Sequence, residues 1–472
     1  VRRGPRLVKL VAMFHRLLIA NRGEVAARIA RACRDLDIQP VGVVSEADAD
    51  SAWAKEMDEV CCIGPGAPTD SYLRGERILQ AAKQMRCTAI HPGWGFLAEN
   101  AQFAALCRQH GVTFVGPSPE LMASMGLKSP AKTAMRAAGL PVIPGSDGPL
   151  ADAEEAARVA TEVGFPVILK ADAGGGGRGM RLCHNDKEVR ESFGLCSTEA
   201  LANFGSASVY LEKYLTGGRH IEVQVLVDNY GSAVHLGERE CSVQRRHQKL
   251  TEESPSPALS DVERRELGAM AAEAARRVGY TGAGTIEFLR ASPNEEVGPG
   301  KLYFMEMNTR LQVEHPVSEL VTGIDLAAWQ IRIAAGEALD FTQDDIVFRG
   351  HAVEARINAE DPTLDFRPSP GTLTKFSFDL EAGPGKLRLD THLKQGETVP
   401  PHYDSLLGKL IAWGETRDEA IATLLAGLQS AQVEGLPTTI SLHESVLQSD
   451  AFRSGDYDTA SIPGWPPVAA SN

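Results

Sequence analysis

Hydrophobic and polar positions in the N-terminal part of the chain predict short buried strands that alternate with helices. Apolar runs at 16–21, 40–45, 87–93 and 112–118 have the length of strands buried on both faces. Between the first two runs, the apolar residues of 22–36 recur at intervals of three and four, which places them on one helical face. This alternation predicts a doubly wound parallel sheet, an α/β fold.

A segment rich in glycine and proline, 138–150, marks a boundary, and an α+β pattern follows it. We expect a helix at 152–164, a strand at 166–172, and a C-terminal helix at 417–434 that Gly435 ends. The predicted division is an N-terminal domain, 13–127, a central domain, 128–330, with a lid subdomain at about 143–215, and a C-terminal α+β domain, 331–460, between disordered ends, 1–12 and 461–472.

The stretch EMNTRLQVEH, 306–315, alternates polar and apolar residues with the period of a strand. Its polar positions are Glu306, Asn308, Arg310, Gln312 and Glu314. A solvated face is the simpler interpretation, but such a face usually mixes lysine, serine and threonine. This row instead carries carboxylates and carboxamides, which suit Mg²⁺, and a guanidinium, which suits a small planar anion. We therefore favour a binding site over a solvated face.

An acid inside an apolar strand indicates a metal ion nearby. Glu287 lies within GTIEFL, where an unpaired carboxylate would be costly to bury. A buried salt bridge would also explain this residue. Glu306, on the strand that follows, provides a second acid that we expect to be buried, and two facing carboxylates repel unless a cation lies between them. A metal ion is the favoured explanation.

Basic and glycine-rich segments suit anionic phosphates. Lys170 ends a strand and precedes the glycine run 173–180, whose backbone N–H groups can approach phosphate in a mobile loop. A flexible hairpin tip is the alternative. The segment CSVQRRHQK, 241–249, is a solvated loop, a nucleic-acid patch or, beside a metal–phosphate site, a basic wall for anionic substrates. We expect Arg356 to add an inward-pointing cation.

Composition excludes several classes of protein. The 472 residues carry a formal net charge of −14, which argues against a general nucleic-acid binder, and no apolar run is long enough to span a bilayer. The eight cysteines form no zinc or disulfide pattern, so we expect reduced thiols in a cytoplasmic protein. The basic opening, 1–12, lacks a cleavage site, and we interpret Met13 as the natural start.

Together these motifs resemble biotin carboxylase, the ATP-grasp component of acyl-CoA carboxylases. The matching segments follow the family's order from about 16 to 415, which makes the resemblance specific. They are LIANRGEVAARI, HPGWGFLAEN, GGGGRGM, EKYL, RHIEVQV, CSVQRRHQK, GTIEF, EMNTRLQVEHPV and GHAVEARINAEDP.

The resemblance implies a role for each candidate residue. Metal ions that bridge the ATP phosphates, Mg²⁺ or Mn²⁺, would be bound by Glu287, Glu306 and Asn308. The nucleotide would be contacted by Lys128, Lys170, Gly174, Gly175, Gly176, Gly177, Glu212, Lys213, His220, Gln244 and His247. Bicarbonate would be bound by Lys249, Arg310, Gln312 and the backbone of Val313. Glu314 would be the general base and Arg356 would stabilise the biotin enolate, with Lys249 and Arg310 completing the catalytic group.

Two positions depart from the family's pattern. Trp94 replaces a tyrosine that is usual near the biotin ring, which bears on the affinity for biotin. Leu127 replaces an aspartate that commonly precedes the lysine, which bears on the role of Lys128. Neither change removes a catalytic group.

The resemblance implies that ATP and bicarbonate are used to carboxylate biotin through carboxyphosphate. The sequence has no Met-Lys-Met attachment site, so biotin would arrive on a carrier protein and serve a separate carboxyltransferase; a homodimer is also implied. The segment PGSDGPL favours an acetyl-CoA carboxylase, and hence fatty acid synthesis, over a propionyl- or methylcrotonyl-CoA type.

Two alternatives come from other classes of function. One is another ATP-grasp carboxylate–amine ligase, and the other is a non-catalytic ATP-binding scaffold, which would need neither Glu314 nor Arg356. An oxidoreductase is disfavoured because the loop 20–26 lacks the G-x-G-x-x-G fingerprint.

Overall fold

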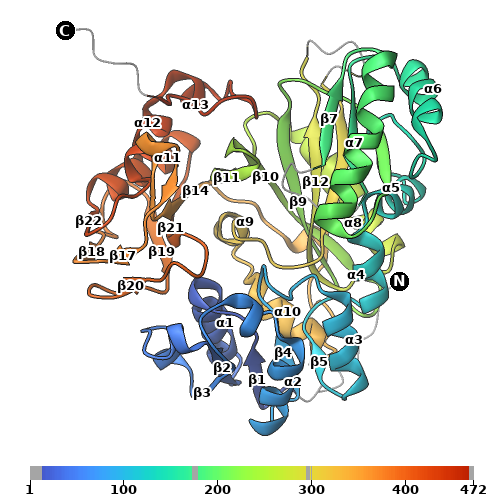
Figure 1. Ribbon diagram of the computed structural model, residues 1–472. Coiled ribbons are helices and arrows are strands. Elements are labelled where there is room, and N and C mark those ends of the chain that lie inside the picture. The colour runs from blue at the N-terminus through green and yellow to red at the C-terminus, as the bar shows by residue number, and fades with distance from the viewer. Residues whose placement is uncertain (1–12, 173–178, 294–297, 299, 467–472) are drawn as a thin grey trace, which may run out of the picture.

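A five-stranded parallel sheet forms the N-terminal body of the molecule, in the order β3-β2-β1-β4-β5 (Figure 1). Its elements are β1 (Arg16–Ile19), α1 (Gly23–Asp35), β2 (Gln39–Val44), β3 (Glu59–Cys62), α2 (Gly75–Gln84), β4 (Ala89–His91), α3 (Ala101–Gln109) and β5 (Thr113–Phe114). The predicted doubly wound parallel sheet is confirmed.

The computed structural model describes residues 13–172, 179–293, 298 and 300–466. Three predictions therefore fall wholly or partly outside the described residues. They concern residues 1–12, the outermost part of the C-terminal end predicted to be disordered, and most of the glycine run 173–180.

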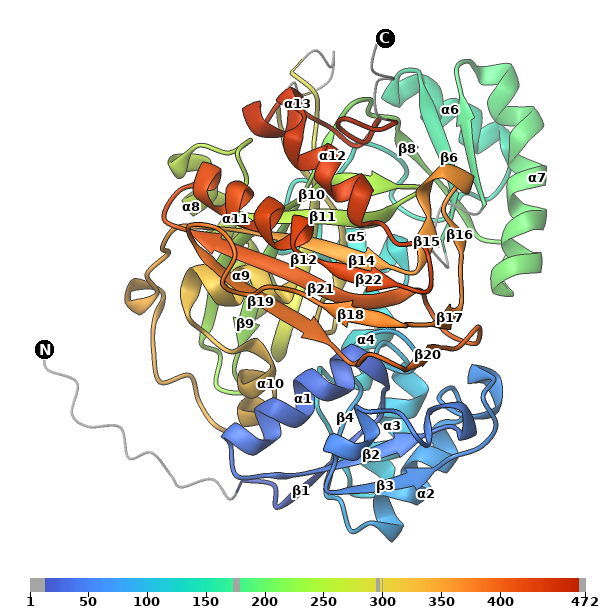
Figure 2. The same ribbon diagram turned by 90° about the vertical axis from the view of Figure 1, so that its left-hand side faces the viewer.

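An eight-stranded antiparallel sheet forms the centre and continues into the C-terminal part of the molecule (Figure 2). Its strands, in spatial order, are β13 (Leu302–Asn308), β12 (Gly282–Arg290), β9 (Arg219–Val227), β10 (Ala233–Arg245), β11 (Gln248–Ser254), β14 (His351–Asn358), β21 (Leu406–Gly414) and β19 (Lys386–Thr391). Strands β11 and β14 pair from Thr251–Ala355 to Ser254–Ala352. The central and C-terminal parts of the chain therefore share one backbone hydrogen-bond ladder.

A three-stranded antiparallel sheet, in the order β7-β6-β8, forms a separate unit with two helices (Figure 1). Its elements are α6 (Ala153–Val163), β6 (Val167–Ala171), β7 (Met180–Cys183), α7 (Asp186–Phe204) and β8 (Val209–Lys213). The helix predicted at 152–164 and the strand predicted at 166–172 are confirmed to within a residue or two. Asp152 caps α6 by accepting hydrogen bonds from the backbone of Glu154 and Glu155.

The remaining helices pack around the large sheet. They are α4 (Pro119–Met125), α5 (Lys128–Ala137), α8 (Asp261–Arg277), α9 (His315–Thr322), α10 (Leu326–Ala334), α11 (Arg417–Gln429), α12 (Ile440–Gln448) and α13 (Asp450–Ser454). Short strands β15 (Glu360–Asp361), β16 (Arg367–Pro368), β17 (Gly371–Thr372), β18 (Lys375–Ser377), β20 (Thr398–Val399) and β22 (Gln432–Glu434) form two-stranded pairs in the C-terminal part. Helix α9 contacts β10, β11, β14 and β21, and so lies over the middle of the sheet.

The helix predicted at 417–434 is shorter than expected. Helix α11 ends at Gln429, and residues 432–434 form strand β22, which pairs with β18. Gly435 therefore follows a strand and does not end the helix. It adopts φ +106° where an added Cβ would lie 2.1 Å from the carbonyl oxygen of Thr372, so close backbone approach requires glycine there.

Part of the predicted disordered C-terminal end is folded. Ile462 and Trp465 pack against the hydrophobic core of the C-terminal part, because both side chains gain apolar contacts there. The described residues include no helix long and apolar enough to cross a membrane. None of the eight cysteines is in a disulfide.

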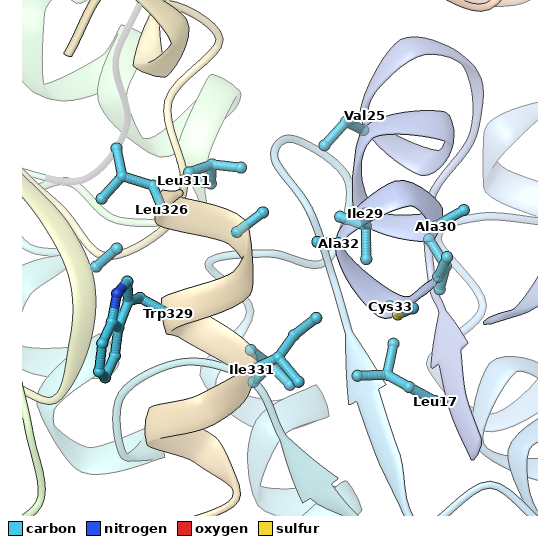
Figure 3. Packing of buried hydrophobic residues seen from close by; sticks show 14 of the residues in the cluster. Leu17, Val25, Ile29, Ala30, Ala32, Cys33, Leu311, Leu326, Trp329 and Ile331 are labelled. Carbon is cyan, nitrogen blue, oxygen red and sulfur yellow. The ribbon is translucent and has the colours of Figure 1, made fainter. Parts of the chain in front are cut away.

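One hydrophobic core joins the N-terminal sheet to the centre of the molecule (Figure 3). Ile29 and Cys33 of α1 and Leu17 of β1 belong to the same buried cluster as Trp329 and Ile331 of α10. Figure 3 shows Ile331 directed from α10 toward the α1 side of this cluster. The N-terminal body is therefore fixed to the central part by apolar packing rather than by strand pairing.

Replacing Ile331 with alanine should weaken this junction. Ile331 is 0% exposed, so Ile331→Ala should lower the free energy of unfolding by about 2–5 kcal/mol through lost burial and an unfilled cavity. Leu201→Ala is the matched control, because Leu201 on α7 is 55% exposed and should cost little. Denaturant unfolding followed by circular dichroism would measure the free energy of unfolding of both variants. Equal decreases would contradict the assignment of Ile331 to the junction.

Candidate active site

Three buried carboxylates meet around the ammonium of Lys249. Nζ of Lys249 lies 2.6 Å from Oε2 of Glu222, 3.0 Å from Oε1 of Glu287 and 2.6 Å from Oε1 of Glu314. Strand register brings the first two acids together, since Glu222 on β9 pairs with Glu287 on β12. The third precedes α9, where the backbone of Glu314 occupies the N-cap position. One cation therefore joins three segments that are distant in sequence.

The charges of this cluster determine its protonation. Burial alone would lower the pKa of Lys249, but the three carboxylates outweigh it and hold that pKa well above its usual range. Burial alone would raise the pKa of Glu314, but Lys249 and Arg356 outweigh it and hold the pKa well below its ordinary value. Lys249 is therefore an ammonium and Glu314 an ionised carboxylate at neutral pH.

Arg356 connects Glu314 to a fourth acid. Its guanidinium lies 2.8 Å from Oε2 of Glu314 and 2.5 Å from Oε1 of Glu252. Burial, together with the charge of Glu314, raises the pKa of Glu252 to about 7 despite the opposing effect of Arg356. Each oxygen of Glu314 thus faces its own cation, Lys249 on one side and Arg356 on the other. The predicted inward position of Arg356 agrees with this geometry.

The predicted strand across 306–315 is wrong beyond Asn308. Strand β13 ends there, and the following residues turn away to begin α9 at His315, with Pro316 in its first turn. β12 continues to Gly282, but its pairing with β13 ends at Thr285–Asn308, and the backbone N–H of Thr309 donates to Glu99 instead. The polar residues still converge on Glu287: its Oε1 accepts hydrogen bonds from Nδ2 of Asn308 at 2.8 Å and Nε2 of Gln312 at 3.4 Å.

Glu306 is less buried than predicted. It pairs in register with Glu287, but its side chain is 41% exposed because β13 is at the sheet edge. Nζ of Lys128 lies 2.7 Å from its carboxylate. The sequence predicted two facing buried acids with a metal ion between them. The structure instead shows one buried acid beside Lys249 and one half-exposed acid beside Lys128.

Arg310 is positioned by an acid that the sequence did not single out. Its Nε donates to Glu99 at 2.8 Å, and another guanidinium nitrogen donates to Oε1 of Gln312 at 3.0 Å. Glu99 follows strand β4 of the parallel sheet in the N-terminal body. The N-terminal body therefore contributes a charge to the site, next to the residues from 308 to 312.

The predicted nucleotide contacts form a second group of charges. Glu212 on β8 accepts from Lys170 at 2.8 Å and from Lys132 at 3.0 Å. Burial would raise the pKa of Glu212, but these two lysines lower it to about 2. His220 lies 3.0 Å from Oε2 of Glu287, which raises the pKa of the histidine against the effect of its burial. Lys128 beside Glu306, and Lys132 and Lys170 beside Glu212, thus provide three cations for an elongated anion.

Three predicted contacts are arranged differently from this group. Lys213 is buried and donates to the carbonyl oxygens of Gly164 and Phe165 at 3.2 and 2.7 Å, so its ammonium has structural partners. Gln244 and His247 lie where β10 turns into β11, and His247 is exposed with φ +68°. Gly174, Gly175, Gly176 and Gly177 lie outside the described residues.

Five polar residues of the site were missed by sequence reasoning. They are Glu99, Lys132, Glu222, Arg239 and Glu252. Arg239 is fully buried and donates to Glu222 at 2.5 Å and to Gln224 at 2.7 Å. For Glu222 the signal was present, because it lies in the apolar run HIEVQV just as Glu287 lies in GTIEFL. Glu99 and Lys132 do not lie within predicted strands, so they give no such signal.

The site has the parts needed to activate an oxyanion and to bind phosphates. Glu314 is an ionised carboxylate held by two cations, and Lys128 and Lys170 extend the positive charge toward β8. A family model described as the carbamoyl-phosphate synthase L chain ATP-binding domain matches residues 128–342. Fold and site together define an enzyme of the ATP-grasp class.

The rest of the chain specifies the family. Models described as the biotin carboxylase N-terminal and C-terminal domains match residues 13–122 and 354–463. The chain is 50% identical to biotin carboxylase 1 of Bacillus subtilis (strain 168) over 447 residues, covering 95% of this chain and 98% of that protein. The chain therefore belongs to the biotin carboxylase family and is a ligase.

Proteins and domains of other biotin-dependent carboxylases are also similar to this chain. A pyruvate carboxylase subunit from Methanothermobacter thermautotrophicus is 46% identical, over 95% of this chain and 89% of that protein. The biotin carboxylase domain dimer of Hydrogenobacter thermophilus 2-oxoglutarate carboxylase, solved with MgADP, ADP and bicarbonate, has a TM-score of 0.89 and 45% identity, covering 95% of this chain and 97% of that one.

The Glu212 cluster predicts a pH-dependent stability. The folded pKa of about 2 is below the ordinary 4.5, so ionised Glu212 stabilises the protein above pH 4.5 and this contribution disappears as pH falls toward 2. Glu212→Gln should lower the free energy of unfolding at pH 7 by about 3 kcal/mol, because buried Lys132 and partly buried Lys170 lose their shared charge partner. Its difference from the wild type should shrink below pH 4.5.

Urea unfolding between pH 7 and the acid limit of the native state would measure this difference. Glu191→Gln, at an exposed position of α7, is the control and should match the wild type throughout. A Glu212→Gln deficit that is constant across the whole range would reject the ion-pair explanation.

Proposed function

We propose that this protein uses ATP and bicarbonate to carboxylate biotin that is attached to a separate carrier protein. The reaction passes through carboxyphosphate and is the first half-reaction of a biotin-dependent carboxylase. One observation carries the proposal: Glu314 is ionised and fully buried between Lys249 and Arg356, beside Gln312 and the Val313 backbone. The related Hydrogenobacter structure contains bicarbonate and MgADP, which supports these ligands here.

Glu314 is proposed to remove the proton from bicarbonate. Bicarbonate is a poor nucleophile until it loses this proton, so a carboxylate within hydrogen-bonding reach accelerates its attack. The low pKa of Glu314 ensures that it is ionised when bicarbonate arrives. Its basicity must then rise, which happens if Lys249 and Arg356 shift their charge from Glu314 to the bound anions. Lys249, Arg310, Gln312 and the Val313 backbone are proposed to orient bicarbonate.

The oxyanion of bicarbonate then attacks the γ-phosphorus of ATP, and ADP leaves. Negative charge gathers on the transferred phosphoryl group, and Lys128, Lys170 and His220 are proposed to neutralise it. Glu212 positions Lys170, and Glu306 positions Lys128. Arg356 is proposed to stabilise the enolate of biotin while the carboxyl group passes from carboxyphosphate to biotin, and inorganic phosphate leaves with the proton that biotin gives up.

The residues fit a divalent cation. Glu287, Glu306 and Asn308 provide hard oxygen donors on adjacent strands, the set that Mg²⁺ prefers. Oxygens of Glu287 and Glu306 already attract Lys249, His220 and Lys128, which shows that the site stabilises positive charge. These three side chains would bind the metal, which would shield the charge of the ATP phosphates. We propose Mg²⁺, with Mn²⁺ as a substitute.

The wider assignments also remain our proposals. Carrier and carboxyltransferase proteins are the proposed partners, with a homodimer as the assembly and the cytoplasm as the location. The proposed domains are 13–127, 128–330 and 331–460, with the lid at about 143–215. We propose an acetyl-CoA carboxylase, on the segment PGSDGPL, although pyruvate and 2-oxoglutarate carboxylase relatives are similarly close.

Variants of Glu314 and Arg356 should impair different steps, bicarbonate-dependent ATP hydrolysis and the carboxylation of biotin. Glu314→Gln keeps size and hydrogen bonding but cannot accept the proton, so bicarbonate-dependent ATP hydrolysis should fall by about 100-fold or more. Arg356→Ala should retain more of this hydrolysis while it loses carboxylation of free biotin. A coupled phosphate assay measures hydrolysis, and labelled bicarbonate measures carboxybiotin.

Glu266→Gln on the exposed face of α8 controls for the loss of one acid. Normal bicarbonate-dependent hydrolysis by Glu314→Gln would place the base elsewhere. Hydrolysis that responds to an organic acid and not to bicarbonate would indicate a different ATP-grasp ligase. No hydrolysis by the wild type would indicate a scaffold.

Metal dependence tests the carboxylate assignment. Calorimetric titration of the wild type should show that ATP binds more tightly with Mg²⁺ than without it. Glu306→Ala should lose most of that difference, because one of two carboxylate ligands is gone. Glu266→Ala should keep it. Unchanged Mg²⁺ dependence in Glu306→Ala would exclude Glu306 as a ligand.

A further inference from the structure

Two neighbouring strands of the C-terminal part each direct one cation at the turn that carries the base. Arg356 on β14 and Lys409 on β21 are cross-strand partners, so their side chains project from the same face of the sheet. Arg356 contacts the carboxylate of Glu314 at 2.8 Å, and Nζ of Lys409 donates to the carbonyl oxygen of Val313 at 2.8 Å. Two successive residues of the turn are therefore bound by two adjacent strands.

Hydrogen bonds to the carbonyl oxygens of Gln312 and Val313 fix the peptide planes of this turn. Nδ1 of His315 lies 2.7 Å from the carbonyl oxygen of Gln312, and since a carbonyl only accepts, this ring nitrogen is the donor. Burial holds the pKa of His315 well below its usual range, so the ring is neutral. In a trans peptide the N–H points opposite to the C=O. The bonds to Gln312 and Val313 thus orient the N–H groups of Val313 and Glu314.

Lys409 has a second set of partners that could by itself explain its burial. The side chain is 0% exposed, and its ammonium lies 3.1 Å from Glu24 of α1 and 3.9 Å from Asp390 of β19. Asp390 does not depend on Lys409, because Arg388 donates to both of its oxygens at 3.0 and 2.6 Å. The remaining structural explanation is that Lys409 only compensates buried carboxylates: that of Glu24, and that of Glu354 on β14, whose pKa Lys409 lowers against the larger effect of burial.

We propose that Lys409 is a positioning residue for bicarbonate. Its bond to Val313 sets the direction of the adjoining peptide, and with it the place of the Glu314 side chain relative to the anion. This role rests on the proposed function, in which Val313 and Glu314 contact bicarbonate. The hydrogen bond to a carbonyl oxygen carries the proposal, because charge compensation of Glu24 and Glu354 does not require it.

The test compares variants that differ only at Lys409. Glu24→Gln removes the buried charge but leaves the bond to Val313, whereas Glu24→Gln/Lys409→Met removes both with little change of volume. Relative to Glu24→Gln, the double variant should raise KM for bicarbonate about tenfold, because a misdirected peptide weakens anion binding. KM for ATP should stay within about twofold, since the nucleotide contacts lie on other strands.

Bicarbonate-dependent ATP hydrolysis by the wild type is measured first; if it is absent, the proposed function fails before Lys409 is tested. Equal KM values for bicarbonate in Glu24→Gln and the double variant would overturn the positioning role. The same conclusion would follow if KM for ATP rose equally, or if Glu24→Gln folded and the double variant did not. In that last case the ammonium would be a requirement of folding rather than of bicarbonate binding.

Discussion

The ammonium of Lys249 allows three carboxylates to share one buried space, and the rest of the site depends on that contact. Each buried carboxylate alone would lose its hydration, and the three together would also repel one another. With Lys249 at 2.6–3.0 Å from all of them, the strands carrying Glu222 and Glu287 and the turn carrying Glu314 can meet. Arg239, buried behind Glu222, adds a second cation that further reduces this repulsion.

The same arrangement makes the site responsive to anions. Carboxylates pair with Lys249, His220 and Arg356, so these three cationic side chains are held within the site. A bound phosphate or bicarbonate competes with those carboxylates for the same cations, and the pKa of each freed carboxylate must then rise. In the proposed reaction, the binding of bicarbonate and the activation of Glu314 as the base would therefore be two results of one exchange of ion-pair partners.

The sequence predicted the features that depend on local pattern. The parallel sheet and helix α6 follow from hydrophobic periodicity and turn residues within a few positions of each element. Glu287 was found because an acid in an apolar strand is costly wherever the strand lies. The family resemblance, not the pattern, assigned roles to Lys249 and Arg356.

The predictions that were wrong concern features that depend on residues distant in sequence. The alternation of 306–315 continues past Asn308 although the strand ends there, since periodicity does not record that the N–H of Thr309 donates to Glu99 of the N-terminal body. Helix α11 ends early because 432–434 pairs with β18, more than fifty residues away in sequence. Glu99 is a partner of Arg310 only through the packing of the N-terminal body on the centre, as shared core residues on α1 and α10 indicate.

The ladder between β11 and β14 has a mechanical consequence. Because the central and C-terminal strands share backbone hydrogen bonds, Lys249, Arg356 and Lys409 belong to one stiff frame that cannot bend at the domain boundary without breaking them. The three-stranded unit that carries Lys170 and Glu212 belongs to a separate sheet. Relative displacement is therefore least costly between that unit and the frame. Such a displacement would change the spacing between Lys170 and Glu314, while the proposed bicarbonate contacts would keep their geometry.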